Sequence, residues 1–382
     1  MTRWWLSLWL AWSMVACTSA PPRPDPQTLL HDAAFTPPPH SIDAADIFAI
    51  DDAMRRYLND GGSSSVFRRN RAEWLMQSLY QRGDLKIEYD GGVTRNAAQT
   101  FDARAGNCMS LVVMTAALAK ELGLHVEYNS AYTEETWSRH GSLLLRNGHV
   151  NITIGKRLVD RPRGHDAREW TVDFLPPGEL QGLRVRPIEE STVVAMFMNN
   201  RAAEALARDD TNEAYWWARA GVMADPGFAG VINTLGVVYL RSGQPEAAAR
   251  VFNDLLQRQP NHIQALNNLA LLYEQQGRFD RATPLRVRLA ALEPEPPYHW
   301  FNQGQQALRR GDAHAARDFF AREVKRADYS SEFHYWLAVA QYRLGEFEAA
   351  QQQLERAQAL STSSDERDLY AAKLAWLTQR PR

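Results

Sequence analysis

Four glycines in the second half of the chain are separated by the same interval. Gly243, Gly277, Gly311 and Gly345 follow one another at steps of 34 residues, with no insertion or deletion between them. A fixed period of this length is typical of an array in which each unit is a pair of helices stacked on its neighbours. Glycine relieves backbone strain at a tight turn. The interval therefore predicts a helical solenoid with one glycine at each turn between paired helices.

Small residues and prolines recur within this period. The first helix of each unit is expected to carry a small residue where it meets the second, because the two helices pack closely. These residues are Gly236, Ala270, Gly304 and Ala338. Pro260 and Pro294 lie where second helices should end, since proline cannot continue a helix. Residues 365–379 mix apolar and polar side chains, which predicts a closing helix over the last unit.

This pattern resembles the tetratricopeptide repeat. The predicted array occupies residues 188–382 and ends in the capping helix. Its five units are expected near 195–228, 229–262, 263–296, 297–330 and 331–364. The resemblance implies a concave surface that binds a protein or peptide partner. An array that only braces the neighbouring domain, or forms a dimer, is the alternative.

The N-terminal segment has the pattern of an export signal. An apolar run from Trp4 to Val15 leads to Cys17, which resembles a bacterial lipoprotein signal peptide at 1–16 with Cys17 as the lipidated residue. Residues 17–45 are rich in proline and are expected to form an extended tether. The resemblance implies a location in the cell envelope. By the same resemblance, Thr18 after the lipidated residue implies anchorage in the outer membrane, facing the periplasm.

Composition excludes several classes of function. With 382 residues, the chain is long enough for at least two domains. Its formal net charge of -2 argues against nucleic acid as a partner, because the basic field needed to displace counterions from phosphates is missing. Neither paired Cys-x-x-Cys nor His-x-x-x-His on a helix occurs, so we expect no metal site and no cofactor.

Residues 46–187 have a different pattern from the array. Helices are expected over 46–59, 66–82 and from Cys108 to Leu122. Strand-like runs follow at 125–130, 142–146, 149–154 and 170–174. Helices followed by a short antiparallel sheet predict an α+β domain.

Cys108 needs an explanation in a chain that has only one other cysteine. It stands at the predicted start of a helix, where backbone N–H groups and the helix dipole stabilise a thiolate. His149 opens an alternating strand and is a candidate general base. Asp173 is a candidate to orient the imidazole, with Asp160 as the rival. The simpler interpretations are a packed cysteine, a polar strand histidine and a surface carboxylate.

Residues 50–180 resemble the transglutaminase-like domain, which has a papain-like fold. Cys108 with the helix that follows it carries most of the resemblance, and His149 and Asp173 match the later motifs. The resemblance implies that Cys108 is the nucleophile, His149 the general base and acid, and Asp173 the orienting group. The side-chain donor to an oxyanion stays open among Gln99, Asn107 and Tyr128.

Two functions therefore follow from the sequence. The first is a membrane-anchored thiol enzyme that acts on amide bonds, as a peptidase, an amidase or an acyl transferase, with repeats that recruit a partner. The second is a non-catalytic envelope adaptor that binds peptides or proteins through the repeats and the cleft.

Overall fold

The computed structural model describes most of the chain. The described residues are 25–61, 66, 70–81, 87–140, 143–155, 169–173, 184–361 and 364–378. Along the two long strands, the side chains of 131–149 fall outside this description. Cys17 and Asp160 also lie outside the described residues.

The N-terminal part begins with short helical elements. They are η1 (Pro26–Leu29), η2 (Asp32–Ala34), η3 (Ala45–Phe48), α1 (Asp52–Gly61), α3 (Arg71–Met76) and the π-helical turn η4 (Gln77–Gln81). Asp25 caps η1 by accepting a hydrogen bond from the backbone N–H of Gln27, and Pro26 occupies the first position of η1. Proline suits this position because the first N–H of a helix has no partner inside it.

A central helix and a small antiparallel sheet follow. The helices are α4 (Ala97–Ala103) and α5 (Cys108–Glu121), and the short parallel pair is β1 (Glu88–Tyr89) with β2 (Ala105–Gly106). The larger sheet contains β3 (His125–His140), β4 (Leu143–Gly155), β5 (Trp170–Val172) and β6 (Arg184–Ile188), in the order β5-β4-β3-β6. The two expected strands at 142–146 and 149–154 are one strand, β4, because pairing with β3 continues across them.

Helix α5 is the centre of the N-terminal core. Every side chain from Met109 to Ala119 is buried. The helix packs against β4 and β3, and the buried core also contains Val150, Ile152 and Ile154. A helix that is apolar on all sides needs cover from several elements. The remaining cover includes α6, whose Phe197 belongs to the same core.

The C-terminal part is a run of paired helices. The pairs are α6 (Glu190–Ala207) with α7 (Thr211–Ala224), α8 (Ala229–Arg241) with α9 (Pro245–Arg258), α10 (Ile263–Gln275) with α11 (Phe279–Leu292), α12 (His299–Arg309) with α13 (Ala313–Arg326), and α14 (Ser331–Arg343) with α15 (Phe347–Leu360). The helix α16 (Ser364–Thr378) packs on α15. No helix within the described residues is both long and apolar enough to cross a bilayer.

The turn inside four of these pairs uses a left-handed backbone. Gly243, Gly277, Gly311 and Gly345 have φ of 72, 70, 80 and 79°. The residue one period before Gly243 is Asp209, which adopts the same conformation with φ of 63°. A left-handed residue lets the chain reverse directly after a helix, and glycine does this without steric cost.

The small residue on the first helix of a pair faces the second helix, at the residue sixteen positions later in the chain. Where that residue is phenylalanine, the small residue is glycine: a β-carbon on Gly236 would overlap the ring of Phe252, and one on Gly304 would lie 2.6 Å from Phe320. Where that residue is a leucine, as at Leu354, an alanine is accommodated at Ala338. Small and large residues thus compensate across the pair.

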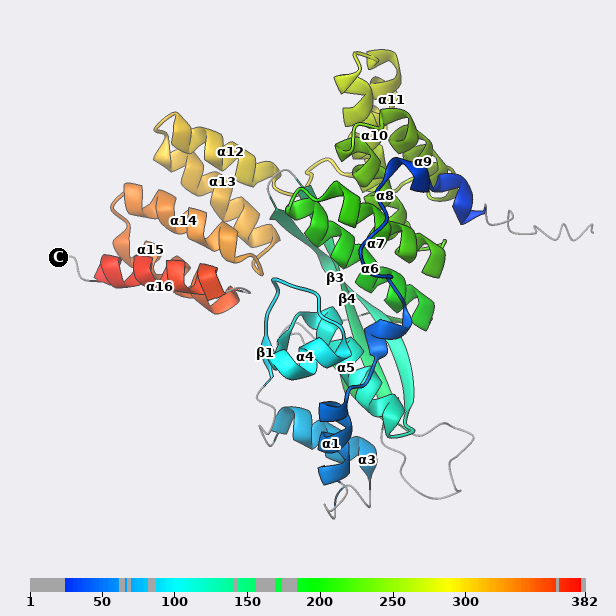
Figure 1. Ribbon diagram of the computed structural model, residues 1–382. Coiled ribbons are helices and arrows are strands. Elements are labelled where there is room, and N and C mark those ends of the chain that lie inside the picture. Colours follow the sequence, from blue (N-terminus) through cyan, green and yellow to red (C-terminus); the bar gives the residue numbers. More distant parts are fainter. Residues whose placement is uncertain are drawn as a thin grey trace, which may run out of the picture.

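The array is interrupted between α11 and α12. Within the described residues, all the remaining consecutive helices from α6 to α16 pack against each other. The buried core also divides between α11 and α12. Figure 1 shows α8 to α11 and α12 to α16 as two separate stacks. The only buried side chain of α11 is Ala282, while Phe279 and Val287 are exposed. The sequence period continues unbroken across this gap, so it predicts a continuity that the structure does not have.

We expect the change Gly236→Ala to destabilise the array by about 1–3 kcal/mol, because the new methyl group collides with a buried ring. Adding Phe252→Leu should recover much of this loss, because the chain already uses alanine with leucine at Ala338 and Leu354. Urea unfolding followed by circular dichroism at 222 nm measures both effects. Equal stability of Gly236→Ala and the unmodified chain would contradict this account of the packing.

Candidate functional site

Cys108 is the first residue of α5, as the sequence predicts. Its side chain is half-buried and, among the described residues, is a free thiol. Asn107 caps the helix: its side-chain oxygen accepts hydrogen bonds from the backbone N–H and the hydroxyl of Ser110, both at 2.9 Å. A polar cap of this kind fixes the first turn of a helix. The position of the thiol is therefore set by the turn before it.

That turn is braced from the repeat array. The amide Nδ2 of Asn107 donates to Oγ1 of Thr94 at 2.8 Å. The backbone N–H of Thr94 donates to Oε1 of Glu204 in α6 at 2.7 Å, and the guanidinium of Arg201 donates to the Thr94 carbonyl at 3.2 Å. The first helix of the array thus holds the segment that carries Cys108.

The three side chains considered as oxyanion donors make structural hydrogen bonds. Gln99 accepts from the backbone N–H of Asn96 in a capping box, and Asn107 caps α5. The hydroxyl of Tyr128 donates to Oε2 of Glu190 at 2.9 Å. Burial, together with the charge and hydrogen bond of Glu190, raises the pKa of Tyr128 well above its usual range.

Asp173 and the backbone of His149 lie on neighbouring strands. Pairing of Ile152 with Val172 sets Asp173 beside Asn151, whose Nδ2 donates to Oδ2 of Asp173 at 2.8 Å. His149 is two positions before Asn151 in β4, and its backbone pairs with Ala131. The imidazole lies outside the described side chains. The topology thus brings the backbones of two of the three predicted residues near each other, on β4 and directly after β5.

Residues 25–36 lie across the array instead of forming the expected extended tether. In Figure 1 this segment crosses α9, α8 and α7. Leu29 is buried in the core of the array, and its carbonyl accepts a hydrogen bond from the hydroxyl of Tyr239 at 2.8 Å. The ring of Phe35 stacks on Tyr215, with centroids 3.9 Å apart and planes within 3°. Aromatic burial of this kind offsets the entropy of ordering a short segment.

Polar contacts complete the docking. The hydroxyl of Tyr215 donates to Oδ1 of Asp32 at 2.6 Å, and Nε of Arg219 donates to its two carboxylate oxygens at 2.9 and 3.0 Å. Trp216 and Asn212 both donate to the carbonyl of Thr36. Burial alone would raise the pKa of Asp32, but the hydrogen bonds from Arg219 and Tyr215 outweigh it, so the pKa is lowered.

We call this surface the first groove. Its residues are Asn212, Tyr215, Trp216, Arg219, Tyr239 and Gln244. The proline content of 17–45 predicted a tether instead, although Leu29, Asp32 and Phe35 are evenly spaced at three residues. A signal was present: the array repeats the tyrosine of this groove at Tyr239 and Tyr273.

Models of the tetratricopeptide repeat match residues 233–285 and 331–356. The C-terminal half of the chain contains tetratricopeptide repeats. Both matches fall within the run of helical pairs from α8 to α15, and the prediction of these repeats is confirmed. The tetratricopeptide repeats form an all-helical region, whereas the strands belong to the N-terminal part.

Two curated relatives resemble parts of the chain. Protein FlbA of Caulobacter vibrioides is 29% identical over 150 residues, which are 38% of this chain and 25% of FlbA. The uncharacterized protein ycf37 of Pyropia yezoensis is 36% identical over 64 residues, 17% of this chain and 36% of that protein. The chain thus spans between a quarter and two fifths of these relatives.

Solved structures of repeat proteins are also similar. A thermophilic tetratricopeptide-repeat protein of Thermus thermophilus is 16% identical, with 47% of this chain and 99% of that chain covered and a TM-score of 0.31. PilF of Pseudomonas aeruginosa is 19% identical, with 50% and 94% covered and a TM-score of 0.28.

Proposed function

We propose that this protein is an adaptor whose tetratricopeptide repeats bind short, extended peptide segments of a partner protein. One observation carries the proposal: the array already holds such a segment, residues 25–36, in the first groove. Peptide recognition needs an apolar anchor and polar groups that fix direction. Leu29 and Phe35 provide anchors, and Asp32 provides the charged contact.

The contacts in the first groove are of the type that separate chains use. A tyrosine hydroxyl bonds a main-chain carbonyl, and an arginine bonds a carboxylate, so recognition depends on the backbone path and on one acidic side chain. Each contact joins residues more than 180 positions apart in the chain. The segment therefore behaves as a tethered ligand of the array.

A capped synthetic peptide of residues 25–36 should bind the chain lacking residues 1–40 with one-to-one stoichiometry, as measured by fluorescence anisotropy. The peptide change Asp32→Asn should weaken binding about tenfold, because it removes a charge-assisted contact with Arg219. The affinity of the unmodified peptide should be full above about pH 4 and fall as the pH drops through the lowered pKa of Asp32. The Asp32→Asn peptide should lack this pH dependence.

The peptide change Asp25→Asn is the matched control. It removes the same charge, but asparagine still caps η1, so affinity should stay within about twofold. Equal losses for both changes would show nonspecific charge attraction. Absence of binding to a folded chain would overturn the proposed function.

The thiol enzyme is the second candidate, favoured by the half-buried thiol of Cys108 at the first position of α5. In this mechanism the thiolate attacks an amide carbonyl carbon, a C–S bond forms, and the C–N bond breaks as His149 protonates the leaving amine. Water then hydrolyses the thioester and regenerates the thiol. Asp173 would orient the imidazole.

Rapid alkylation of Cys108 by iodoacetamide, slowed at least tenfold by His149→Ala at pH 7, is the expected result for this enzyme. His125→Ala is the control, because His125 pairs with Gly155 at one end of the β3–β4 pairing, six residues along β3 from the partner of His149. Equal alkylation rates in the unmodified chain, His149→Ala and His125→Ala would contradict the role of His149 as the catalytic base.

Anchorage to the outer membrane through a lipid on Cys17 is a further proposal, supported by the sequence pattern at 1–17. Cells that express the protein should incorporate a fatty-acid analogue into it, and Cys17→Ser should abolish the label. Labelling that persists in Cys17→Ser would contradict the proposed anchor.

A further inference from the structure

A second groove lies one repeat beyond the first. A cavity of about 450 Å³ is lined by α9, the end of α10 and the start of α11. Six of its lining residues are those of the first groove advanced by one period of 34 residues. They are Glu246, Ala249, Arg250, Asn253, Tyr273 and Arg278, in place of Asn212, Tyr215, Trp216, Arg219, Tyr239 and Gln244. Because the repeats preserve backbone geometry, the two grooves have the same framework.

The second groove has a tyrosine at the position of the one that donates a hydrogen bond to the peptide backbone in the first groove. Tyr273 corresponds to Tyr239, whose hydroxyl donates to the carbonyl of Leu29 in the first groove. Ala249 corresponds to Tyr215, the ring that stacks on Phe35. Replacing a phenol ring by a methyl group leaves open the volume that the ring fills in the first groove. The cavity can therefore accept an aromatic side chain from a ligand.

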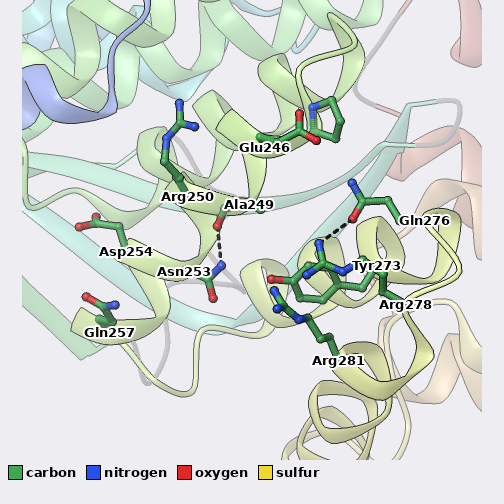
Figure 2. A pocket seen from close by; sticks show the side chains of 11 residues that line it. Glu246, Ala249, Arg250, Asn253, Asp254, Gln257, Tyr273, Gln276, Arg278 and Arg281 are labelled. Carbon is green, nitrogen blue, oxygen red and sulfur yellow. Dashed lines mark hydrogen bonds between the residues drawn. The ribbon is translucent and has the colours of Figure 1, made fainter.

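The charge of the second groove is also different. Arg250 replaces a tryptophan and Arg278 replaces a glutamine, while Arg281 adds a third guanidinium to the lining. In the opposite direction, Asn253 replaces Arg219 and Glu246 replaces Asn212. Figure 2 shows Arg278 and Arg281 beside the ring of Tyr273, at 4.9 and 5.8 Å from its centroid. Of the two carboxylates in the lining, Asp254 forms an ion pair with Arg258. The groove thus favours an acidic ligand.

The next two repeats have no equivalent groove at the corresponding residues. One period further on, the residues lie on α11, where the array is interrupted and no following unit closes the surface. At the fourth position Arg317 and Glu346, which correspond to Tyr215 and Gln244, form an ion pair at 2.7 Å. Within the described repeats, the second groove thus corresponds to the first groove but has no segment of the chain docked in it.

We propose that the second groove binds a short, extended acidic segment of a partner protein, with an aromatic side chain over Ala249 and a carboxylate beside Arg278 and Arg281. This inference rests on the proposed peptide-binding function and names its ligand class. The segment 25–36 of the same chain already occupies the first groove, so the second groove is left for another protein.

The test uses the full-length chain and, as probe, the capped fluorescent peptide of residues 25–36, which contains two aspartates and a phenylalanine. We expect saturable anisotropy binding that weakens as salt rises. The double variant Arg278→Glu, Arg281→Glu should weaken it by more than tenfold, because two attractive charges become repulsive. The charge-matched control is Arg309→Glu with Arg310→Glu, at two exposed arginines at the end of α12, and it should change the affinity less than twofold.

The other outcomes separate this inference from the proposed function. Binding that is lost in Arg219→Glu but not in the double variant would place the peptide in the first groove and overturn the second. Binding only by the chain lacking residues 1–40 would also place the peptide in the first groove and overturn the second groove as its site. Concentration-dependent dimers in sedimentation, abolished by the double variant, would make a second copy the occupant and overturn the assignment to a partner. No binding by any folded form would overturn both proposals.

Discussion

The distance between paired helices depends on matching a small residue on the first helix with a large one on the second. Gly236 with Phe252 and Gly304 with Phe320 show the tightest form of this contact. The left-handed glycines set the reversal in four of the pairs, and the small residues allow the close approach of the two helices. The grooves follow from this constraint: residues one period apart occupy equivalent places, and only their chemistry differs.

Helix α6 serves two parts of the molecule. Its first half completes the core around α5, and its second half belongs to the core of the array. Its Glu204 holds the backbone of Thr94, which in turn is bonded by the residue that caps the helix of Cys108. The peptide in the first groove also contacts α7. A ligand on the array and the turn before Cys108 are therefore linked by one continuous set of packed helices.

Local patterns predicted much of the fold. The 34-residue period located the helical pairs, their turns and the closing helix, and the residues before Cys108 located the start of α5. These features depend on contacts between near neighbours in sequence. The docking of 25–36 and the gap before α12 were not predicted, because each depends on surfaces brought together from distant parts of the chain. At the candidate site, the sequence named Asp173 but not its hydrogen bond with Asn151.

By itself, the sequence determined that the second half forms tetratricopeptide repeats, because period, turn glycines and small residues are local requirements of helix packing. It also determined that Cys108 begins a helix. Only the tertiary structure decided that Leu29 and Phe35 lie on the array, and that the groove they occupy beside Tyr215 is open at Ala249 in the next repeat. The physical reason is that burial and charge at a surface depend on which distant segment covers it, and no local pattern specifies that partner.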